Sequence, residues 1–305
     1  MHKFLPRTFQ QWFEVFLIGG ISIATLVTVV LYILDNVFLT KHSDSIARSC
    51  ATSINAQVCL LQDGSTISFK NSSRTVQYDL QGKKFERVAL SPNGTNVLLV
   101  TRESRIPEVQ SPQFWIFNLE TKKLTMFPIG GYNPSFLNDD AFAYDLKDRV
   151  YVTRLSDPDQ VINLVSGTRP SGFVGKNSFA YETKEHQLAI FRIETLESIL
   201  LPIPFKAFSP AVSPDGELIA FLTASEEVGC TPFCNRNLWV YQMQSRYYWP
   251  VHTSGNKAHP VWISNQSLIA QSDQDLFFLA QYVGLPMYEF DAKGTHAPTF
   301  FTLYP

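Results

Sequence analysis

Short apolar runs separated by polar turns repeat along the chain from Val58 to its C-terminal region. These runs are too short for helices, and their many aromatic and β-branched residues favour strands. The clearest unit is Phe208–Val251, which contains the turn Ser213-Pro214-Asp215-Gly216. Proline sets φ at the second turn position, and glycine closes the turn at no steric cost. We predict four strands in this unit, at 209–212, 217–222, 237–241 and 247–251.

Weaker copies of this unit follow one another at about forty residues, a spacing typical of propeller blades. The second copy keeps the turn Ser91-Pro92-Asn93-Gly94, whereas the third and fourth keep related second strands, at Ala141–Tyr144 and Ser178–Tyr181. One such sheet cannot bury both of its faces alone, so the copies are expected to pack against one another. The sequence therefore predicts an all-β fold, a six-bladed β-propeller, with five blades or an open ring as the alternative.

The first copy has three predicted strands, at 58–62, 66–69 and 75–79, where the others have four. The sixth copy already has four predicted strands, at 259–263, 267–270, 275–279 and 286–290. A final apolar segment, Thr299–Leu303, is then left without a sheet. We expect it to complete the first sheet, because ring closure pairs strand edges that are otherwise open.

The N-terminal region has a different pattern, because Val15–Leu34 is apolar without a single charge. At about 1.5 Å per residue this run is about 30 Å long, the thickness of a bilayer core. We predict an uncleaved signal-anchor helix at 12–35, which makes the chain a single-pass membrane protein. A buried core helix and a cleaved signal peptide are the alternatives, and the run is longer than a signal peptide needs.

The predicted helix divides the chain into a short tail at 1–11, a polar linker at 36–57 and the propeller domain at 58–305. Two basic residues flank each side of the helix, so the positive-inside rule does not decide its orientation. The N-terminal tail is too short to be a domain. We therefore expect the tail to be cytoplasmic and the propeller to be extracytoplasmic.

The charge balance and the cysteine content have little effect on the predicted fold and membrane placement. The chain has 25 Lys and Arg against 27 Asp and Glu, a balance that does not point to nucleic acid. The 4 cysteines are too few for a disulfide framework at this length. Cys230 and Cys234 are favoured as a local disulfide over free thiols, given the extracytoplasmic placement. Cys50 and Cys59 form a weaker candidate for a second pair.

The common catalytic motifs are absent from the sequence. It has no G-x-S-x-G, no H-E-x-x-H and no phosphate-binding glycine loop, and its histidines are scattered. We expect no enzyme activity, no cofactor and no metal site. One alternative is an enzyme, a hydrolase or lyase, with its site in the propeller channel. Such an enzyme needs clustered acidic, His or Tyr side chains on the innermost strands. The residues predicted for those strands are mostly apolar or small. A membrane sensor with a partner helix is the other alternative.

Two long connections between second and third strands carry the candidate binding site. They span 102–113 in the second unit and 225–236 in the fifth, which stand opposite each other in a ring of six. Such connections emerge on one face of a propeller, so we predict a partner-binding surface there, with insertions of no function as the alternative. The candidate residues are Arg102, Glu103, Arg105, Glu226, Glu227, Phe233 and Arg236.

The turn Ser213–Gly216, the strand after it and Asn237-Leu-Trp-Val-Tyr241 together resemble the TolB-type, WD-repeat-like propeller repeats. As a periodicity the resemblance covers most of Phe85–Phe290. The same repeats occur in the propeller domains of prolyl oligopeptidase-like enzymes, whose nucleophile motif is absent here. The resemblance implies a non-catalytic platform in the cell envelope that binds or assembles protein partners.

Overall fold

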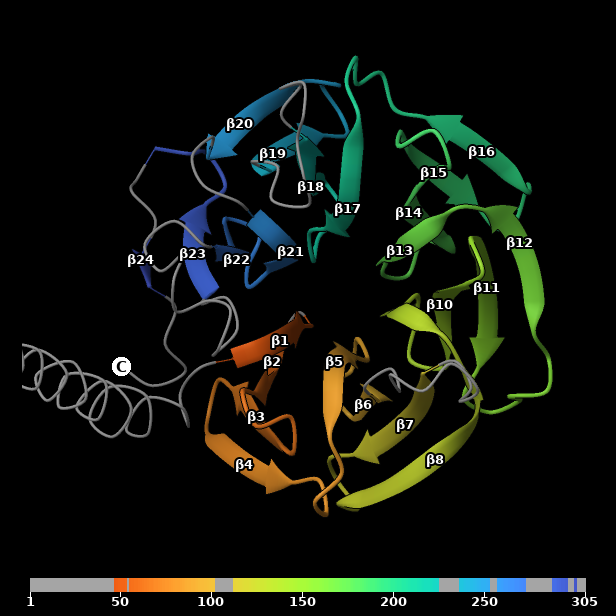
Figure 1. The fold of residues 1–305 in the computed structure, drawn as a ribbon, viewed down its shortest axis with the longest axis vertical. Helices are drawn as coiled ribbons and strands as arrows, with labels where there is room; N and C mark the ends of the chain where they lie inside the picture. Colours follow the sequence, from red (N-terminus) through yellow and green to blue (C-terminus); the bar gives the residue numbers. More distant parts are fainter. Residues whose placement is uncertain are drawn as a thin grey trace, which may run out of the picture. The chain divides into compact units, whose positions relative to one another are not determined.

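The computed structural model describes residues 47–53, 55–101, 112–224, 236–252, 257–272, 287–295 and 299–300. These residues form six four-stranded antiparallel sheets. Figure 1 shows the sheets arranged radially around a central axis. The predicted all-β, six-bladed propeller is therefore confirmed.

Each sheet is formed by four strands that follow one another in the chain. The first contains β1 (Ala47–Thr52), β2 (Ala56–Leu61), β3 (Thr66–Asn71) and β4 (Thr75–Asp79). The second contains β5 (Phe85–Leu90), β6 (Asn96–Thr101), β7 (Gln113–Asn118) and β8 (Lys123–Gly130). The third contains β9 (Tyr132–Phe136), β10 (Ala141–Leu146), β11 (Arg149–Arg154) and β12 (Ile162–Ser166).

The other three sheets have the same order of strands. The fourth contains β13 (Thr168–Phe173), β14 (Ser178–Glu182), β15 (Leu188–Arg192) and β16 (Glu197–Leu200). The fifth contains β17 (Ala207–Val212), β18 (Leu218–Ala224), β19 (Arg236–Gln242) and β20 (Tyr248–His252). The sixth contains β21 (Lys257–Trp262), β22 (Ser267–Ser272), β23 (Met287–Asp291) and β24 (Thr299–Phe300).

The turn that marks each copy in the sequence joins the first and second strands of its sheet. In the fifth sheet the amide of Gly216 donates to the carbonyl of Ser213 at 2.8 Å. Gly216 has φ 71° and Gly94 has φ 74°, a left-handed conformation that only glycine adopts without strain. The marker turn is thus a local device that orders a hairpin.

Hydrophobic clusters fill the space between each pair of neighbouring sheets. In the third sheet Phe142 and Tyr144 pack toward the second sheet, whereas Ala143 packs toward the fourth. Phe142 is fully buried, and its ring lies 5.7 Å from that of Phe114. Successive strand residues point to opposite faces, so the repeated Phe-Ala-Tyr places large rings on one face and a small residue on the other. The motif therefore specifies how neighbouring blades fit together.

Ring closure differs from the prediction. The first sheet gains its fourth strand from β1, inside the predicted linker, whereas β24 pairs with β23 in the sixth sheet. The predicted closure by Thr299–Leu303 and the linker at this segment are both wrong. The strand β1 was missed because its sequence, ARSCAT, is polar: it lies innermost, and only Ala47 and Cys50 in it are buried. In the sixth sheet the third strand is β23, and the predicted strand at 275–279 lies outside the described residues.

Closure therefore depends on packing between the first and sixth sheets. Ala47, Cys50 and Ile269 belong to one buried cluster there. The hydroxyl of Thr52 also donates to the carbonyl of Trp262, which links β1 directly to β21. A disulfide joins Cys50 to Cys59, which lie opposite each other on β1 and β2. The weaker cysteine candidate is thus present, while Cys230 and Cys234 lie outside the described residues.

The predicted membrane segment at 12–35 also lies outside the described residues. Within the part of the chain that the structure describes, no helix is long and apolar enough to cross a bilayer.

Candidate functional site

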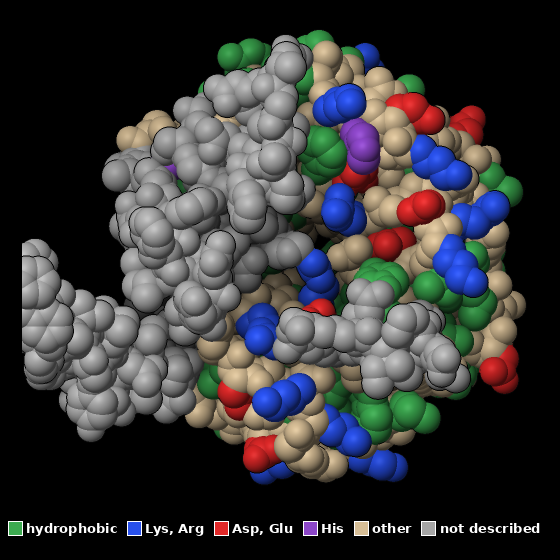
Figure 2. Space-filling model, viewed as in Figure 1, with side chains coloured by type: hydrophobic (Ala, Val, Ile, Leu, Met, Phe, Trp, Pro, Cys, Tyr) green, Lys and Arg blue, Asp and Glu red, His purple; other side chains and the backbone are tan. Residues whose placement is uncertain are grey.

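A central cavity of about 450 Å³ lies on the axis of the ring. Residues of the innermost strands β1, β5, β9, β13, β17 and β21 all line it. Figure 2 shows one face of the ring, with Lys and Arg side chains close to the hollow at its centre. The cavity is therefore the one place where all six blades meet.

Each innermost strand has a register shift against its neighbour close to its first residue. The shifts fall at Ala47/Ser49, Phe85/Arg87, Tyr132/Ser135, Thr168/Ser171, Phe208/Ala211 and Ala258/Val261. Such bulges bend a strand and redirect its side chains. Asn133, Arg169 and Ser209 each precede a proline at these positions and have φ of 47°, 52° and 49°. The bulges thus form a ring of unusual backbone at one end of the cavity.

The charged residues that line the cavity are all at this same end. They are Arg48, Glu86, Arg87 and Arg169, which we call the charged mouth. The rest of the lining has no charged side chain. The cavity is therefore polarised, with charge at one end and small, polar or apolar groups beyond it.

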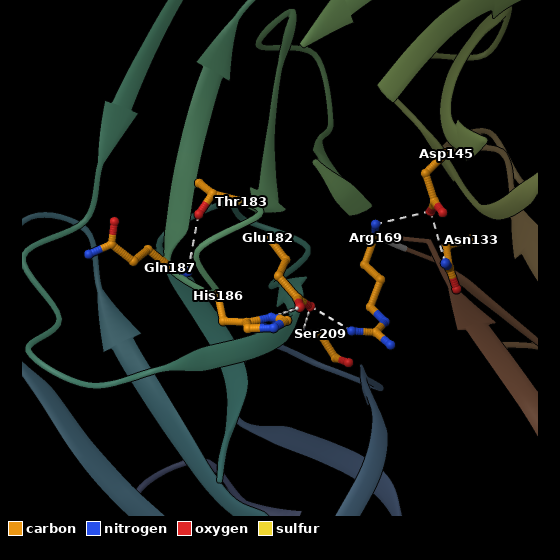
Figure 3. A network of polar contacts seen from close by, with 8 residues as sticks. All are labelled: Asn133, Asp145, Arg169, Glu182, Thr183, His186, Gln187 and Ser209. Atoms are coloured by element: carbon orange, nitrogen blue, oxygen red, sulfur yellow. Dashed lines mark hydrogen bonds and ion pairs between the residues drawn. The ribbon is translucent and has the colours of Figure 1, made fainter. Parts of the chain in front are cut away.

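Glu182, the last residue of β14, lies at the centre of a polar network next to the charged mouth (Figure 3). One of its carboxylate oxygens accepts from Arg169 Nη1 at 2.6 Å and from the backbone amide of Ser209 at 3.3 Å. The other oxygen lies 2.8 Å from Nδ1 of His186. Glu182 is only 2% exposed, so these three contacts take the place of water around a buried carboxylate.

Asp145, near the end of β10 in the third sheet, corresponds in position to Glu182 at the end of β14 in the fourth sheet. Its Oδ1 accepts from Asn133 Nδ2 at 2.8 Å and from the backbone amide of Arg169 at 3.0 Å. Burial raises the pKa of Asp145 to about 6, against the hydrogen bonds from Asn133 and Arg169 and the charges of Arg169 and Arg87, which lower it. Burial also lowers the pKa of Arg87, and the nearby charge of Arg169 lowers it further. The charges of Asp145 and Glu86 raise the pKa of Arg87, so acids partly offset both of these effects.

The two acids have the same structural role. Asp145 holds the amide of Arg169 and Glu182 holds the amide of Ser209, in each case at the bulge of the next sheet. Both acids directly follow a Phe-Ala-Tyr sequence, at a position where the second and fifth sheets have the buried apolar residues Val100 and Leu222. No local pattern in the sequence pointed to this site. When the repeats are aligned with one another, Asp145 and Glu182 stand where other repeats have an apolar residue. This difference is the signal that indicates the site in the sequence.

The predicted partner-binding residues, except Arg236, lie outside the described residues. Of Arg236 the backbone at the start of β19 is described. Their connections join β6 to β7 and β18 to β19, in sheets that stand opposite each other in Figure 1. Both connections leave the ring on the face of the charged mouth, because Thr101 pairs with Phe85 and Thr223 with Ala207. Predicted loops and observed network thus share one face.

Among the described residues, no three His, Cys, Asp or Glu side chains come together as a metal ion would need.

Comparison with known proteins identifies the fold of this chain through solved structures. No protein-family model and no curated protein sequence matches the chain. Among solved structures 1061 chains match, a number that indicates a widely shared architecture. TolB from Acinetobacter baumannii has a TM-score of 0.57 at 13% identity, over 75% of this chain and 57% of that one. The chain thus spans little more than half of the length of that TolB.

Two further structures illustrate the spread of similar proteins. Hydrazine synthase from Kuenenia stuttgartiensis has a TM-score of 0.52 at 11% identity, over 81% of this chain and 77% of that one. The putative TolB from Agrobacterium tumefaciens has a TM-score of 0.48 at 10% identity, over 68% and 80% of the two chains. At these identities the likeness concerns the fold alone. The chain is a six-bladed β-propeller similar in fold to TolB-type proteins.

Proposed function

We propose that this protein is a membrane-anchored, non-catalytic propeller that binds or assembles protein partners on the extracytoplasmic side. One observation carries the proposal: the strands that lead into both long connections end on the face of the ring that holds the charged mouth. Loops presented by a rigid scaffold are common binding sites. A partner that docks on this face contacts both loops and the mouth together.

The state of the buried acids supports a non-catalytic role. Asp145 and Glu182 are 6% and 2% exposed, and each holds a backbone amide of the neighbouring sheet. Carboxylates used in this way hold the bulges in shape. The same groups therefore give the mouth a rigid geometry for binding.

The cellular placement has two supports. The apolar run at 15–34 has the length of a membrane helix. The disulfide between Cys50 and Cys59 suits an oxidising compartment, because cytoplasmic proteins rarely keep such bonds. Protease treatment of sealed vesicles of known orientation tests this placement: the propeller must be cleaved only when its predicted side faces out.

Site-directed photo-cross-linking in native membranes tests the docking face. Lys84 precedes β5 and Lys206 precedes β17, so both exposed residues lie on the face of the mouth. Lys176 lies in the turn between β13 and β14, at the opposite end of the strands. We expect a photoreactive residue at Lys84 or Lys206 to capture a partner and one at Lys176 to capture none. Capture from Lys176 alone, or from no position, contradicts the proposal.

A second candidate function is an enzyme with its site at the same mouth. The contact of His186 with Glu182 beside Arg169 favours it, since such groups serve acid–base chemistry. Hydrazine synthase also shares the fold, although this likeness shows no activity. Screening the purified chain against ester, peptide and glycoside substrates tests this function. Turnover that is lost in His186→Ala establishes it.

A further inference from the structure

The charged mouth presents more positive than negative side chains to the cavity. Three arginines and one glutamate line it, namely Arg48, Arg87, Arg169 and Glu86. The acids that balance the arginines, Asp145 and Glu182, are buried and are not part of the lining. A molecule that enters the cavity therefore meets a cationic surface, although the network around the mouth holds both signs of charge.

Arg169 is held in position for binding. Its Nη1 is fixed by Glu182 at 2.6 Å, and its backbone amide is fixed by Asp145 at 3.0 Å. The side chain nevertheless keeps 38% of its surface exposed, and the residue lines the cavity. A guanidinium restrained in this way loses little conformational entropy when it binds a ligand.

Arg87 adds a second guanidinium close by. It lines the same cavity as Arg169, and the charges of Arg169 and Asp145 act on its pKa in opposite directions. The carboxylate of Asp145 thus partly offsets both guanidinium charges from behind the lining, and a ligand carboxylate adds a second negative charge on the cavity side. Arginine is also the side chain whose planar fork matches a carboxylate.

The remainder of the cavity restricts the ligand. Its lining is uncharged and includes the innermost serines Ser49, Ser135 and Ser171. Each of these hydroxyls already accepts a hydrogen bond from a backbone amide of the next innermost strand. The donors are the amides of Val88, Gly172 and Val212. A volume of about 450 Å³ holds a short peptide segment and excludes a folded domain. Glu86 in the lining disfavours a doubly charged phosphate at the same place.

We infer that the charged mouth binds a carboxylate, an Asp or Glu side chain or a C-terminal carboxylate, carried by a polypeptide segment that inserts into the central cavity. This inference rests on the proposed function and deepens it, because it names the chemical group that a protein partner presents.

Binding of small peptides to the full chain in detergent tests the inference. The acidic probe is acetyl-Gly-Gly-Asp-Gly-Gly-amide, and its match has Asn in place of Asp. Triglycine with a free C-terminus is compared with triglycine amide, and inorganic phosphate serves as the free oxyanion. Isothermal titration or ligand-observed NMR gives the affinities. We expect at least one carboxylate probe to bind about tenfold or more tightly than its neutral match.

Variants then locate the site. Arg87→Gln and Arg169→Gln are each expected to weaken carboxylate binding about tenfold. Arg192→Gln is the control, because Arg192 is exposed and does not line the cavity. Arg169→Gln leaves Glu182 buried without its ion pair, so the double variant Arg169→Gln with Glu182→Gln removes both charges together. It must also lose affinity.

Three outcomes overturn the inference. They are equal affinity for charged and neutral probes, tighter binding of phosphate than of any peptide, and unchanged affinity in all arginine variants. Absence of peptide binding at about 10 mM, above the millimolar range of weak complexes, also overturns it. Cross-linking distinguishes failure of this inference from failure of the proposed function. If the arginine variants still capture a partner from Lys84, the proposed docking function stands and only the carboxylate site is refuted.

Discussion

Asp145→Asn isolates the energetic cost of one buried charge at the mouth. Both hydrogen bonds that the carboxylate accepts, from Asn133 and from Arg169, go to Oδ1. An asparagine side chain keeps a carbonyl oxygen at that position, so both contacts can be retained. The substitution therefore removes the titration of the group while it preserves the geometry.

The magnitude follows from the raised pKa. Burial raises the pKa of Asp145 in the folded protein to about 6, above its ordinary value of 3.8. Because the folded pKa is the higher one, the folded protein binds the proton more tightly than the unfolded chain. Stability from this group is fully present below about pH 4 and is lost as pH rises through about 6. A shift of about two pKa units corresponds to about 3 kcal/mol.

Urea unfolding followed by tryptophan fluorescence, from pH 4 to 7.5, measures the effect. The free energy of unfolding of the wild type is expected to fall by about 2 to 3 kcal/mol relative to Asp145→Asn across this range, because the scan begins just above the ordinary pKa of the group. Asp148→Asn is the control, because Asp148 is exposed, and its curve is expected to stay parallel to that of the wild type. If the wild type and Asp145→Asn give parallel curves, the buried charge costs nothing and the reasoning is wrong.

Three further predictions concern the scaffold. Replacing Cys50 and Cys59 by Ser together is expected to cost about 2 to 3 kcal/mol of unfolding free energy, since a short loop is no longer closed; a reductant must destabilise the wild type by more than it destabilises this variant, which keeps Cys230 and Cys234. Phe142→Ala opens a cavity between the second and third sheets and is expected to cost about 3 to 5 kcal/mol, whereas Tyr247→Ala, at a side chain that is 65% exposed, stays close to the wild type in the same denaturant titration. Ser171→Ala removes the acceptor of the Val212 amide and is expected to cost about 1 kcal/mol; a cost near zero shows that this contact between blades does not contribute.

Local patterns in the sequence determined most of the fold. Turns such as Ser213–Gly216 and the alternation in Phe142-Ala143-Tyr144 depend on neighbours a few residues away, so they can be recognised in one dimension. Their repetition at about forty residues then predicts the six-bladed ring. The same patterns predict that the two long connections emerge on a common face, and the strands before them, β6 and β18, end beside the first residues of β5 and β17.

Contacts between sheets decided the rest. The polar strand β1 closes the ring because it pairs with β2 and packs against the sixth sheet, and no local apolar signal marks it. The Cys50–Cys59 disulfide follows from that same pairing. The charged mouth arises because the innermost strands of different blades bring Arg48, Arg87 and Arg169 to one cavity, although they are far apart in the chain. Such a site depends on how whole sheets are placed around an axis, which only the tertiary structure determines.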